Sequence, residues 1–154
     1  MKRYWIWASW RSSSLTEKRL LLATTNKGKA REIKRLLSGL SFKLESLHDY
    51  PDFGQFQEKG KTFEENSRGK AIFYSLKYPG LVLAEDSGLE VEALEGKPGV
   101  FSARFSGQQS SDEKNIKKLL RLMKNLPESH RLARFTCVAS LAWQGKILKV
   151  YKGQ

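Results

Sequence analysis

Two short apolar runs, at residues 20–24 and 81–84, constrain the fold of this chain more than any other feature. Each run has the length of a buried strand, and each follows charged or turn-forming residues and ends in a polar segment. Helical patterns occupy the stretches that follow them. This alternation of strand and helix predicts an α/β protein, without internal repeats and without a linker long enough to divide domains.

The remaining elements follow from periodicity and caps. A capping box at Thr62 and Glu65, in which each side chain satisfies a free backbone amide, predicts the start of the second helix. Its buried face is predicted to comprise Phe63, Ser67, Ala71, Tyr74 and Tyr78. The other predicted elements are a helix over 27–38 that Gly39 stops, a strand over 42–47, a loop over 48–61, a helix over 111–124, and a hairpin formed by 134–143 and 146–151 that turns at Gln144-Gly145.

Composition narrows the class of protein. The chain has 154 residues, 40% hydrophobic and 29% charged, which excludes a mostly disordered chain. Cys137 is the single cysteine, so no intrachain disulfide forms and a reducing compartment is expected. No apolar run approaches the roughly 20 residues of a membrane-spanning helix. The net charge of +12 favours a polyanionic partner: nucleic acid, an anionic membrane or nucleotide phosphates.

The first 18 residues differ from the rest and are predicted to be a disordered extension of a domain over 19–154. A basic start followed by an apolar stretch is typical of a signal peptide. However, Arg11 interrupts that stretch after seven residues, and no small-x-small cleavage site follows. The three tryptophans within residues 4–10 leave open another interpretation, in which the rings stack on the bases of a single strand.

The junction between the first strand and the first helix, Thr24-Thr25-Asn26-Lys27-Gly28-Lys29, is a candidate anion site. Free amides and the positive dipole at a helix start attract anions, and the two lysines add full charges. The junction is not a P-loop, because the G-x-x-x-x-G-K-[ST] spacing is absent and Ala30 stands at the position of the metal-binding hydroxyl. A helix start with solvated surface lysines explains the same residues.

A second candidate site follows the run at 81–84, where the sequence continues Glu85-Asp86-Ser87-Gly88. Carboxylates at the exposed carboxyl end of a buried strand need partners or a cation. Mg²⁺ prefers oxygen ligands and bridges carboxylates to substrate phosphates, and Glu58 is a further potential ligand. Solvated loop acids are the alternative. Together with the anion site, this pattern indicates chemistry on a phosphate ester or anhydride.

Four ordered motifs give the chain a resemblance to a known family. They are T-T-N-x-x-K-x-x-E from Thr24, T-F-x-E-N-x-x-x-K-A from Thr62, A-E-D-S-G-L-x-V from Ala84, and L-x-G-x-P-G-x-x-S-A-R-x-x-G from Leu94. From about residue 20 to its end, the chain resembles the Ham1/RdgB family. Members of that family are pyrophosphatases that act on non-standard purine nucleoside triphosphates.

The resemblance implies an ITPase/Maf-like mixed sheet flanked by helices and Mg²⁺-dependent hydrolysis of ITP, dITP or XTP to the monophosphate and pyrophosphate. By position, Asp86 is the expected catalytic carboxylate, which binds Mg²⁺ together with Glu58 and activates water. A cytoplasmic homodimer is expected, with a purine nucleoside triphosphate as its partner and neither a membrane nor nucleic acid. The substrate-binding residues implied by position are Thr24, Thr25, Asn26, Lys27, Gly28, Lys29, Lys70 and Ser87.

The chain departs from the family pattern at three motif positions and at its end. Thr25 stands where glycine is common, Ser67 where alanine is, and Glu85 where a first aspartate is, and we assign Glu85 no direct role. Family members continue for several dozen residues with segments that read the purine base, so part of the carboxyl-terminal region is expected to be missing. Ser129-His130-Arg131 matches the family's terminal tripeptide, but it lies ahead of the closing hairpin and is not expected to read the base.

The helix at 111–124 combines basic residues with an apolar stripe that is predicted to face the core. A solvated basic face is expected, and a nucleic-acid patch is the alternative. The chain therefore has a rival function, as a catalytically weak nucleotide- or nucleic-acid-binding module with a basic surface. The basic residues are Lys114, Lys117, Lys118, Arg121 and Lys124, and the stripe is Ile116, Leu119, Leu120 and Met123.

Overall fold

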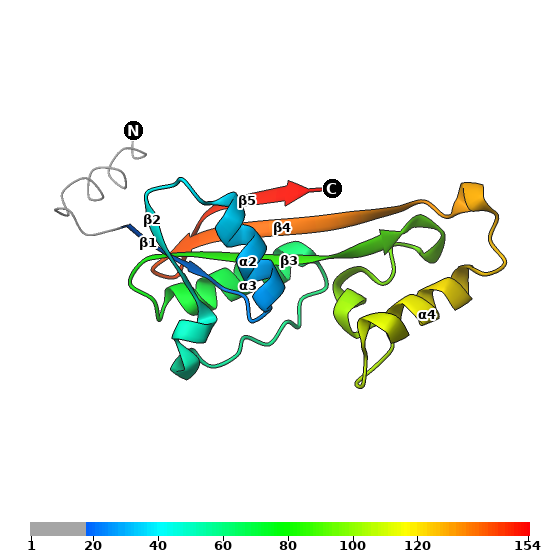
Figure 1. Cartoon of the computed structure of the whole chain (residues 1–154), viewed down its shortest axis with the longest axis horizontal. Helices are drawn as coiled ribbons and strands as arrows, with labels where there is room; N and C mark the ends of the chain where they lie inside the picture. Colours follow the sequence, from blue (N-terminus) through cyan, green and yellow to red (C-terminus); the bar gives the residue numbers. More distant parts are fainter. Residues whose placement is uncertain (1–17) are drawn as a thin grey trace.

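A computed structural model describes residues 18–154 and shows an α/β architecture (Figure 1). The predicted extension lies outside these residues, except for Lys18, which begins the first strand. The sheet has the order β2-β1-β3-β4-β5, with β1 parallel to β2 and β3, and β4 antiparallel to β3 and β5. This mixed sheet confirms the predicted fold class. Its strands are β1 (Lys18–Leu22), β2 (Phe42–Ser46), β3 (Leu81–Val91), β4 (Ala133–Trp143) and β5 (Lys146–Gly153).

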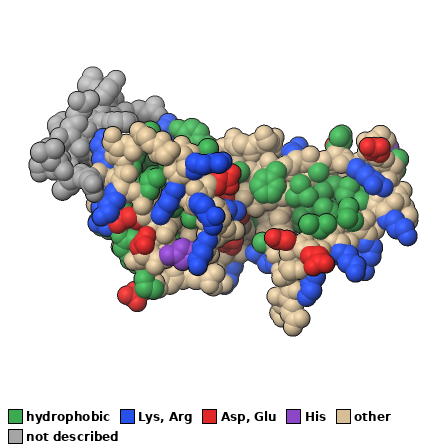
Figure 2. Space-filling model, viewed as in Figure 1, with side chains coloured by type: hydrophobic (Ala, Val, Ile, Leu, Met, Phe, Trp, Pro, Cys, Tyr) green, Lys and Arg blue, Asp and Glu red, His purple; other side chains and the backbone are tan. Residues whose placement is uncertain are grey.

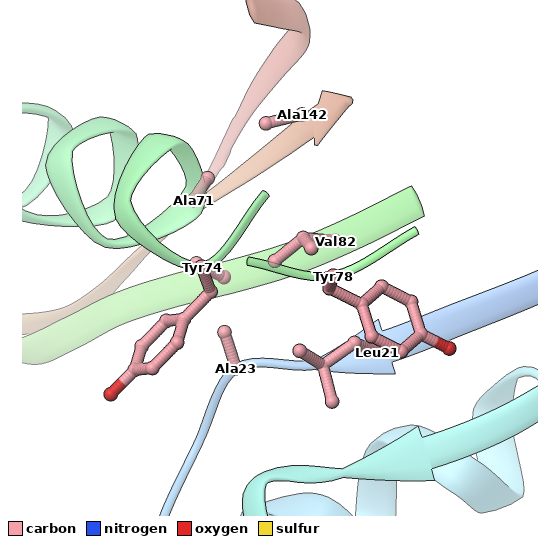
Figure 3. Packing of buried hydrophobic residues seen from close by; sticks show 8 residues of the cluster. Leu21, Ala23, Ala71, Tyr74, Tyr78, Val82 and Ala142 are labelled. Carbon is pink, nitrogen blue, oxygen red and sulfur yellow. The ribbon is translucent and has the colours of Figure 1, made fainter. Parts of the chain in front are cut away.

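Two helices cover opposite faces of the sheet. Side chains of a strand alternate between the two faces, so β1 contributes Leu21 to one core cluster and its neighbours Leu20 and Leu22 to the other. α3 (Phe63–Ser75) packs Ala71 and Tyr74 against the first cluster, as Figure 3 shows. α2 (Lys27–Leu36) packs against the second cluster. The sheet between α2 and α3 is therefore the rigid base from which the polar residues that follow β1 project.

β3 is longer than the sequence predicts. The apolar run indicates a strand that ends at Ala84, but β3 continues to Val91, because β4 pairs with it from Val82 to Val91. β1 accompanies β3 only as far as Leu83. From Ala84 onward no described strand pairs with that edge of β3. Glu85 and Asp86 therefore lie within a strand, beside the point where β1 ends.

The start of α3 confirms the predicted cap in part. Thr62 Oγ1 accepts a hydrogen bond from the Glu65 amide at 3.1 Å, as the capping box predicts. The Glu65 carboxylate accepts from the Lys61 amide rather than from Thr62, so the reciprocal bond reaches one residue further back. All five positions of the predicted apolar face are buried, which confirms the helical period; the last of them, Tyr78, lies beyond the end of the helix.

The connections between these elements are short helical turns. The predicted loop at 48–61 contains η1 (Leu47–Asp49) and η2 (Pro51–Phe53), and β3 is followed by η3 (Glu92–Leu94) and η4 (Gly99–Arg104). η5 (Glu128–His130) precedes β4. The predicted hairpin turn is confirmed, since Gln144 and Gly145 have positive φ angles of 47° and 75°, which suit a tight turn between antiparallel strands.

α4 (Asp112–Met123) lies at the opposite end of the elongated molecule from α2 and α3 (Figure 1). The prediction that its apolar stripe faces the core is wrong for two of the four residues. Met123 is buried, but Ile116 is 56% exposed and Leu120 is 60% exposed. The reason is that α4 packs mainly against η4 rather than lying flat on the sheet. Figure 2 shows hydrophobic side chains gathered on the surface at this end.

A charged cluster between β1 and β2 yields a stability prediction. The Arg19 guanidinium donates to the Glu45 carboxylate at 2.9 Å and lowers the pKa of Glu45 from 4.5 to about 2. Since this pKa is depressed in the folded state, the stabilisation is complete above pH 4.5 and is lost as the pH falls toward 2. Glu45→Gln should lower the unfolding free energy at pH 7 by about 1–2 kcal/mol, a discounted figure because solvent screens the partly exposed Arg19.

Urea unfolding of both proteins at pH 7 and pH 3 measures this difference. We expect the gap between wild type and variant to shrink at the lower pH. A gap that stays constant, or that grows with acidification, would contradict the assigned role of Glu45.

Candidate active site

A cavity of about 570 Å³ opens where β1 ends beside β3. Its walls come from the β1–α2 junction, the segment before α3, α3 itself, β3 and η4. Lys27 and Gly28, although predicted to bind substrate, lie exposed in the first turn of α2 and do not line the cavity. The predicted site residues that do line it are Thr24, Thr25, Asn26, Lys29, Glu58, Lys70, Asp86 and Ser87.

Asn26 caps α2, so the predicted anion site has fewer free amides than the sequence indicated. Its Oδ1 accepts hydrogen bonds from the amides of Gly28 (2.8 Å) and Lys29 (3.1 Å). Thr24 Oγ1 in turn accepts from the Asn26 amide at 3.2 Å. Two of the helix-start amides predicted to be free for phosphate are therefore already bonded. An anion in this cavity meets the Lys29 ammonium and the junction's polar side chains rather than a row of free amides.

Glu85 and Ser87 hold the Lys29 side chain. Lys29 Nζ donates to both carboxylate oxygens of Glu85, at 2.9 and 3.0 Å, and to Ser87 Oγ at 2.9 Å. Glu85 is only 8% exposed, so this charge is buried and paired. The sequence predicted no role for Glu85. Strand alternation could have indicated one, because residues 85 and 87 of β3 lie on the same face of the sheet, toward α2.

Asp86 points to the other face of β3, toward α3. Asn66 Nδ2 donates to Asp86 Oδ2 at 2.8 Å, and the Ser87 amide donates to Asp86 Oδ1 at 3.0 Å. The Gly60 amide donates to Asn66 Oδ1 at 2.7 Å, which fixes the orientation of the Asn66 amide group. Asn66 belongs to the motif that begins at Thr62, and its sequence context predicted no function for it. Here it orients the candidate catalytic carboxylate.

The surroundings of Asp86 raise its pKa above the ordinary value. Burial is the main cause, and the negative charge of Glu58 adds to it, whereas the Asn66 hydrogen bond and the Lys70 charge act in the opposite direction. Lys70 Nζ forms an ion pair with Glu58 and donates to the backbone oxygen of Glu85 at 2.9 Å. The positive charge of Lys70 thus acts on both acidic residues predicted to bind metal and offsets part of the repulsion between them.

η4 forms the wall of the cavity that the sequence analysis missed. A Cβ atom at Gly88 would lie 2.5 Å from the Gly99 oxygen and 2.4 Å from Ser102 Oγ, so only glycine lets η4 pack this closely on β3. Ser102 Oγ accepts from the Leu89 amide and donates to the Gly99 oxygen. This contact places Arg104 at the cavity, although its motif had suggested no role for it.

The donor set for a metal consists of two carboxylates. Glu58 and Asp86 both line the cavity and interact electrostatically. Within residues 18–154, no group of three or more histidine, cysteine, aspartate or glutamate side chains is arranged to hold a metal. Mg²⁺ typically binds one or two carboxylates and completes its coordination with water and phosphate oxygens. The two carboxylates fit that pattern and not a site made wholly of protein ligands.

The sequence that forms this cavity matches a known protein family. The profile of the Ham1 family matches residues 20–154. The chain belongs to the Ham1 family. It is 50% identical over 137 residues to the dITP/XTP pyrophosphatase of Geobacter sulfurreducens, with 88% of this chain and 68% of the relative covered. It is 41% identical over 148 residues to the dITP/XTP pyrophosphatase of Desulforamulus reducens, with 88% and 74% covered.

Solved structures of Ham1 proteins share the fold. The Staphylococcus aureus Ham1 protein superposes with a TM-score of 0.76 at 38% identity, over 88% of this chain and 69% of the other. A HAM1 protein from Coxiella burnetii gives a TM-score of 0.76 at 32% identity, over 89% and 72%. The chain spans about two thirds to three quarters of the length of the two pyrophosphatase relatives, 68% of the Geobacter protein and 74% of the Desulforamulus protein.

Proposed function

We propose that this Ham1-family chain hydrolyses non-standard purine nucleoside triphosphates, such as dITP, XTP and ITP, to the monophosphate and pyrophosphate. The observation that carries the proposal is the buried Asp86 carboxylate, with its raised pKa, in one cavity with Lys29 and Lys70. A carboxylate with a raised pKa can act as a general base, and the two lysines can bind a polyphosphate. The names of the Geobacter and Desulforamulus relatives support this substrate class.

In the proposed reaction, Asp86 accepts a proton from a water molecule while the water oxygen forms a bond to the α-phosphorus. The bond from the α-phosphorus to the bridging oxygen breaks, and pyrophosphate leaves. Lys29 and Lys70 stabilise the negative charge on the phosphate oxygens, and Asn66 keeps the Asp86 carboxylate oriented. Thr24, Thr25, Asn26 and Ser87 offer hydrogen-bonding groups to the substrate from the same cavity.

We assign the cofactor to Glu58 and Asp86, with Mg²⁺ as the ion. Their oxygen donors fit a hard divalent cation that also binds substrate phosphates. When bound, Mg²⁺ neutralises part of the charge of the triphosphate and of the leaving pyrophosphate. Glu58 would exchange its present partner, Lys70, for the ion, which releases the lysine toward the phosphates.

Phosphorus NMR of the reaction with ITP tests this function. We expect pyrophosphate and inosine monophosphate as the first products, activity that requires Mg²⁺, and no diphosphate intermediate. Stepwise release of orthophosphate would contradict attack at the α-phosphorus. If the chain released no pyrophosphate but retained single-stranded DNA in a filter-binding assay, the rival binding-module function would replace this one.

We also propose that the chain forms a homodimer through the exposed apolar side chains around α4. Exposed apolar surface marks interaction sites in soluble proteins, and the large exposed apolar side chains of η4, α4 and the chain around the start of β4 are Phe101, Ile116, Leu120, Leu132 and Phe135. Sedimentation equilibrium should give twice the monomer mass, and a monomer at all concentrations would refute the dimer.

Among residues 18–154, no helix has the length and apolarity needed to cross a membrane. A cytoplasmic location remains a prediction.

A further inference from the structure

The cationic side chains that line the cavity differ in whether a carboxylate is paired with them. Three cationic side chains line it, and two of them already have an acidic partner: Lys29 pairs with Glu85, and Lys70 pairs with Glu58. The third is Arg104. Within residues 18–154, no carboxylate lies at ion-pair distance from its guanidinium group. Its contacts are one long hydrogen bond from Nη2 to the Glu58 backbone oxygen, at 3.4 Å, and the Phe101 ring, 5.2 Å from the guanidinium carbon.

The backbone that carries Arg104 is held firmly. Ser102 joins it to β3 through the Leu89 amide at 2.9 Å. From α4, the Asn115 side chain donates to the backbone oxygens of Ser102 and Ala103, both at 3.2 Å, and accepts from the Ser106 amide at 2.7 Å. The residues on both sides of Arg104 are therefore anchored. The Arg104 side chain itself is exposed, so a ligand that binds it has to order only the side-chain torsions and not the backbone of this segment.

We propose that Arg104 is a further substrate-binding residue, whose guanidinium group binds phosphate oxygens of the triphosphate. A planar guanidinium donates two parallel hydrogen bonds to a phosphate and stays charged at any working pH. Both lysines of the cavity have a glutamate partner in this structure, so Arg104 is the lining cation, among the described residues, whose charge no carboxylate offsets. Arg104 belongs to η4, whereas Lys29 and Lys70 belong to α2 and α3, so the three cations reach the cavity from three different elements.

This inference deepens the proposed function, and a binding experiment separates the two. Isothermal calorimetry with inorganic tripolyphosphate and Mg²⁺ measures affinity without turnover. Arg104→Gln should raise the dissociation constant about tenfold or more, and Arg104→Lys should recover part of the loss, because it keeps the charge but not the bidentate geometry. The matched control is Arg131→Gln, which removes the same charge from a side chain outside the cavity and should change binding by no more than about twofold.

Each possible result of this experiment either supports or overturns the role of Arg104. Unchanged affinity in Arg104→Gln overturns the inference, and so does an equal loss in the Arg131 control, which would indicate an effect of net charge alone. If the wild type binds tripolyphosphate through Arg104 but releases no pyrophosphate from ITP, the inference stands and the proposed function fails. If ITP is hydrolysed but Arg104→Gln binds normally, the proposed function stands and the inference fails. A wild type that neither binds nor hydrolyses overturns both. Circular dichroism and melting temperature check that the variants are folded.

Discussion

Asp86→Asn should lower the turnover of ITP by a factor of about 10³ or more while leaving the fold intact. The substitution keeps the shape of the side chain but removes the group that accepts a proton from water. Asn66 Nδ2 can still donate to the new amide oxygen, whereas the NH2 group cannot accept the hydrogen bond from the Ser87 amide, and this loss offsets part of what the removal of a buried charge gains. Because burial already disfavours the Asp86 carboxylate, its removal should change the unfolding free energy by less than about 1 kcal/mol.

Initial rates of pyrophosphate release and urea unfolding of the same preparation check both parts. Asp52→Asn is the matched control, because it makes the same change at an exposed residue of η2 outside the cavity. Turnover near the wild-type level in Asp86→Asn would show that another group is the base. A variant that no longer folds would assign Asp86 a structural role instead.

Lys70→Met should lower kcat/KM for ITP by about 10² and should also move the acid limb of the pH profile. The loss of rate follows from the missing charge near the phosphates. The pH effect follows from Asp86: the Lys70 charge holds the pKa of this residue down, whereas the Glu58 charge pushes it up. Without the lysine, the Asp86 pKa rises further. Because a base works only when deprotonated, activity should be lost at a higher pH on the acid side.

The pH dependence of kcat/KM measures this shift, and Lys61→Met is the control, with the same substitution near the start of α3 but outside the cavity. Glu58→Gln should move the acid limb in the opposite direction and should raise the Mg²⁺ concentration needed for activity. An acid limb that stays in place in Lys70→Met, despite a lower rate, would show that Asp86 does not set the pH profile.

Most of the secondary structure could be predicted from local patterns. The buried face of α3, its Thr62 cap and the Gln144-Gly145 turn depend on residues a few positions apart. The face and the turn were confirmed, and the cap was confirmed without its reciprocal bond to Thr62. The apolar stripe of α4 was not, because its period indicates a helix but not the neighbour that covers it. Ile116 and Leu120 remain exposed, since α4 packs on η4 rather than on the sheet.

In the candidate site, too, local features could be predicted from the sequence and long-range contacts could not. The motifs name most residues of the cavity, because the sequence preserves their order and spacing, and eight of the ten predicted residues line it. The partners of those residues were not predictable, since they come from segments far apart in the chain. Glu85 meets Lys29 across 56 positions, and Asn66 meets Asp86 across 20.

The sequence by itself determined which segments become strands and helices, where α2 and α3 begin, and which motifs supply phosphate- and metal-binding side chains. Only the tertiary structure decided how those side chains are used. The pairing of β3 with β4 extends the strand through the acidic motif, so Glu85 faces α2 and Asp86 faces α3. The end of β1 opens the cavity beside them, and the docking of η4 on Gly88 brings Arg104 to its wall. The physical reason is that register and close packing depend on partners distant in sequence, whereas helix caps and apolar periods are local.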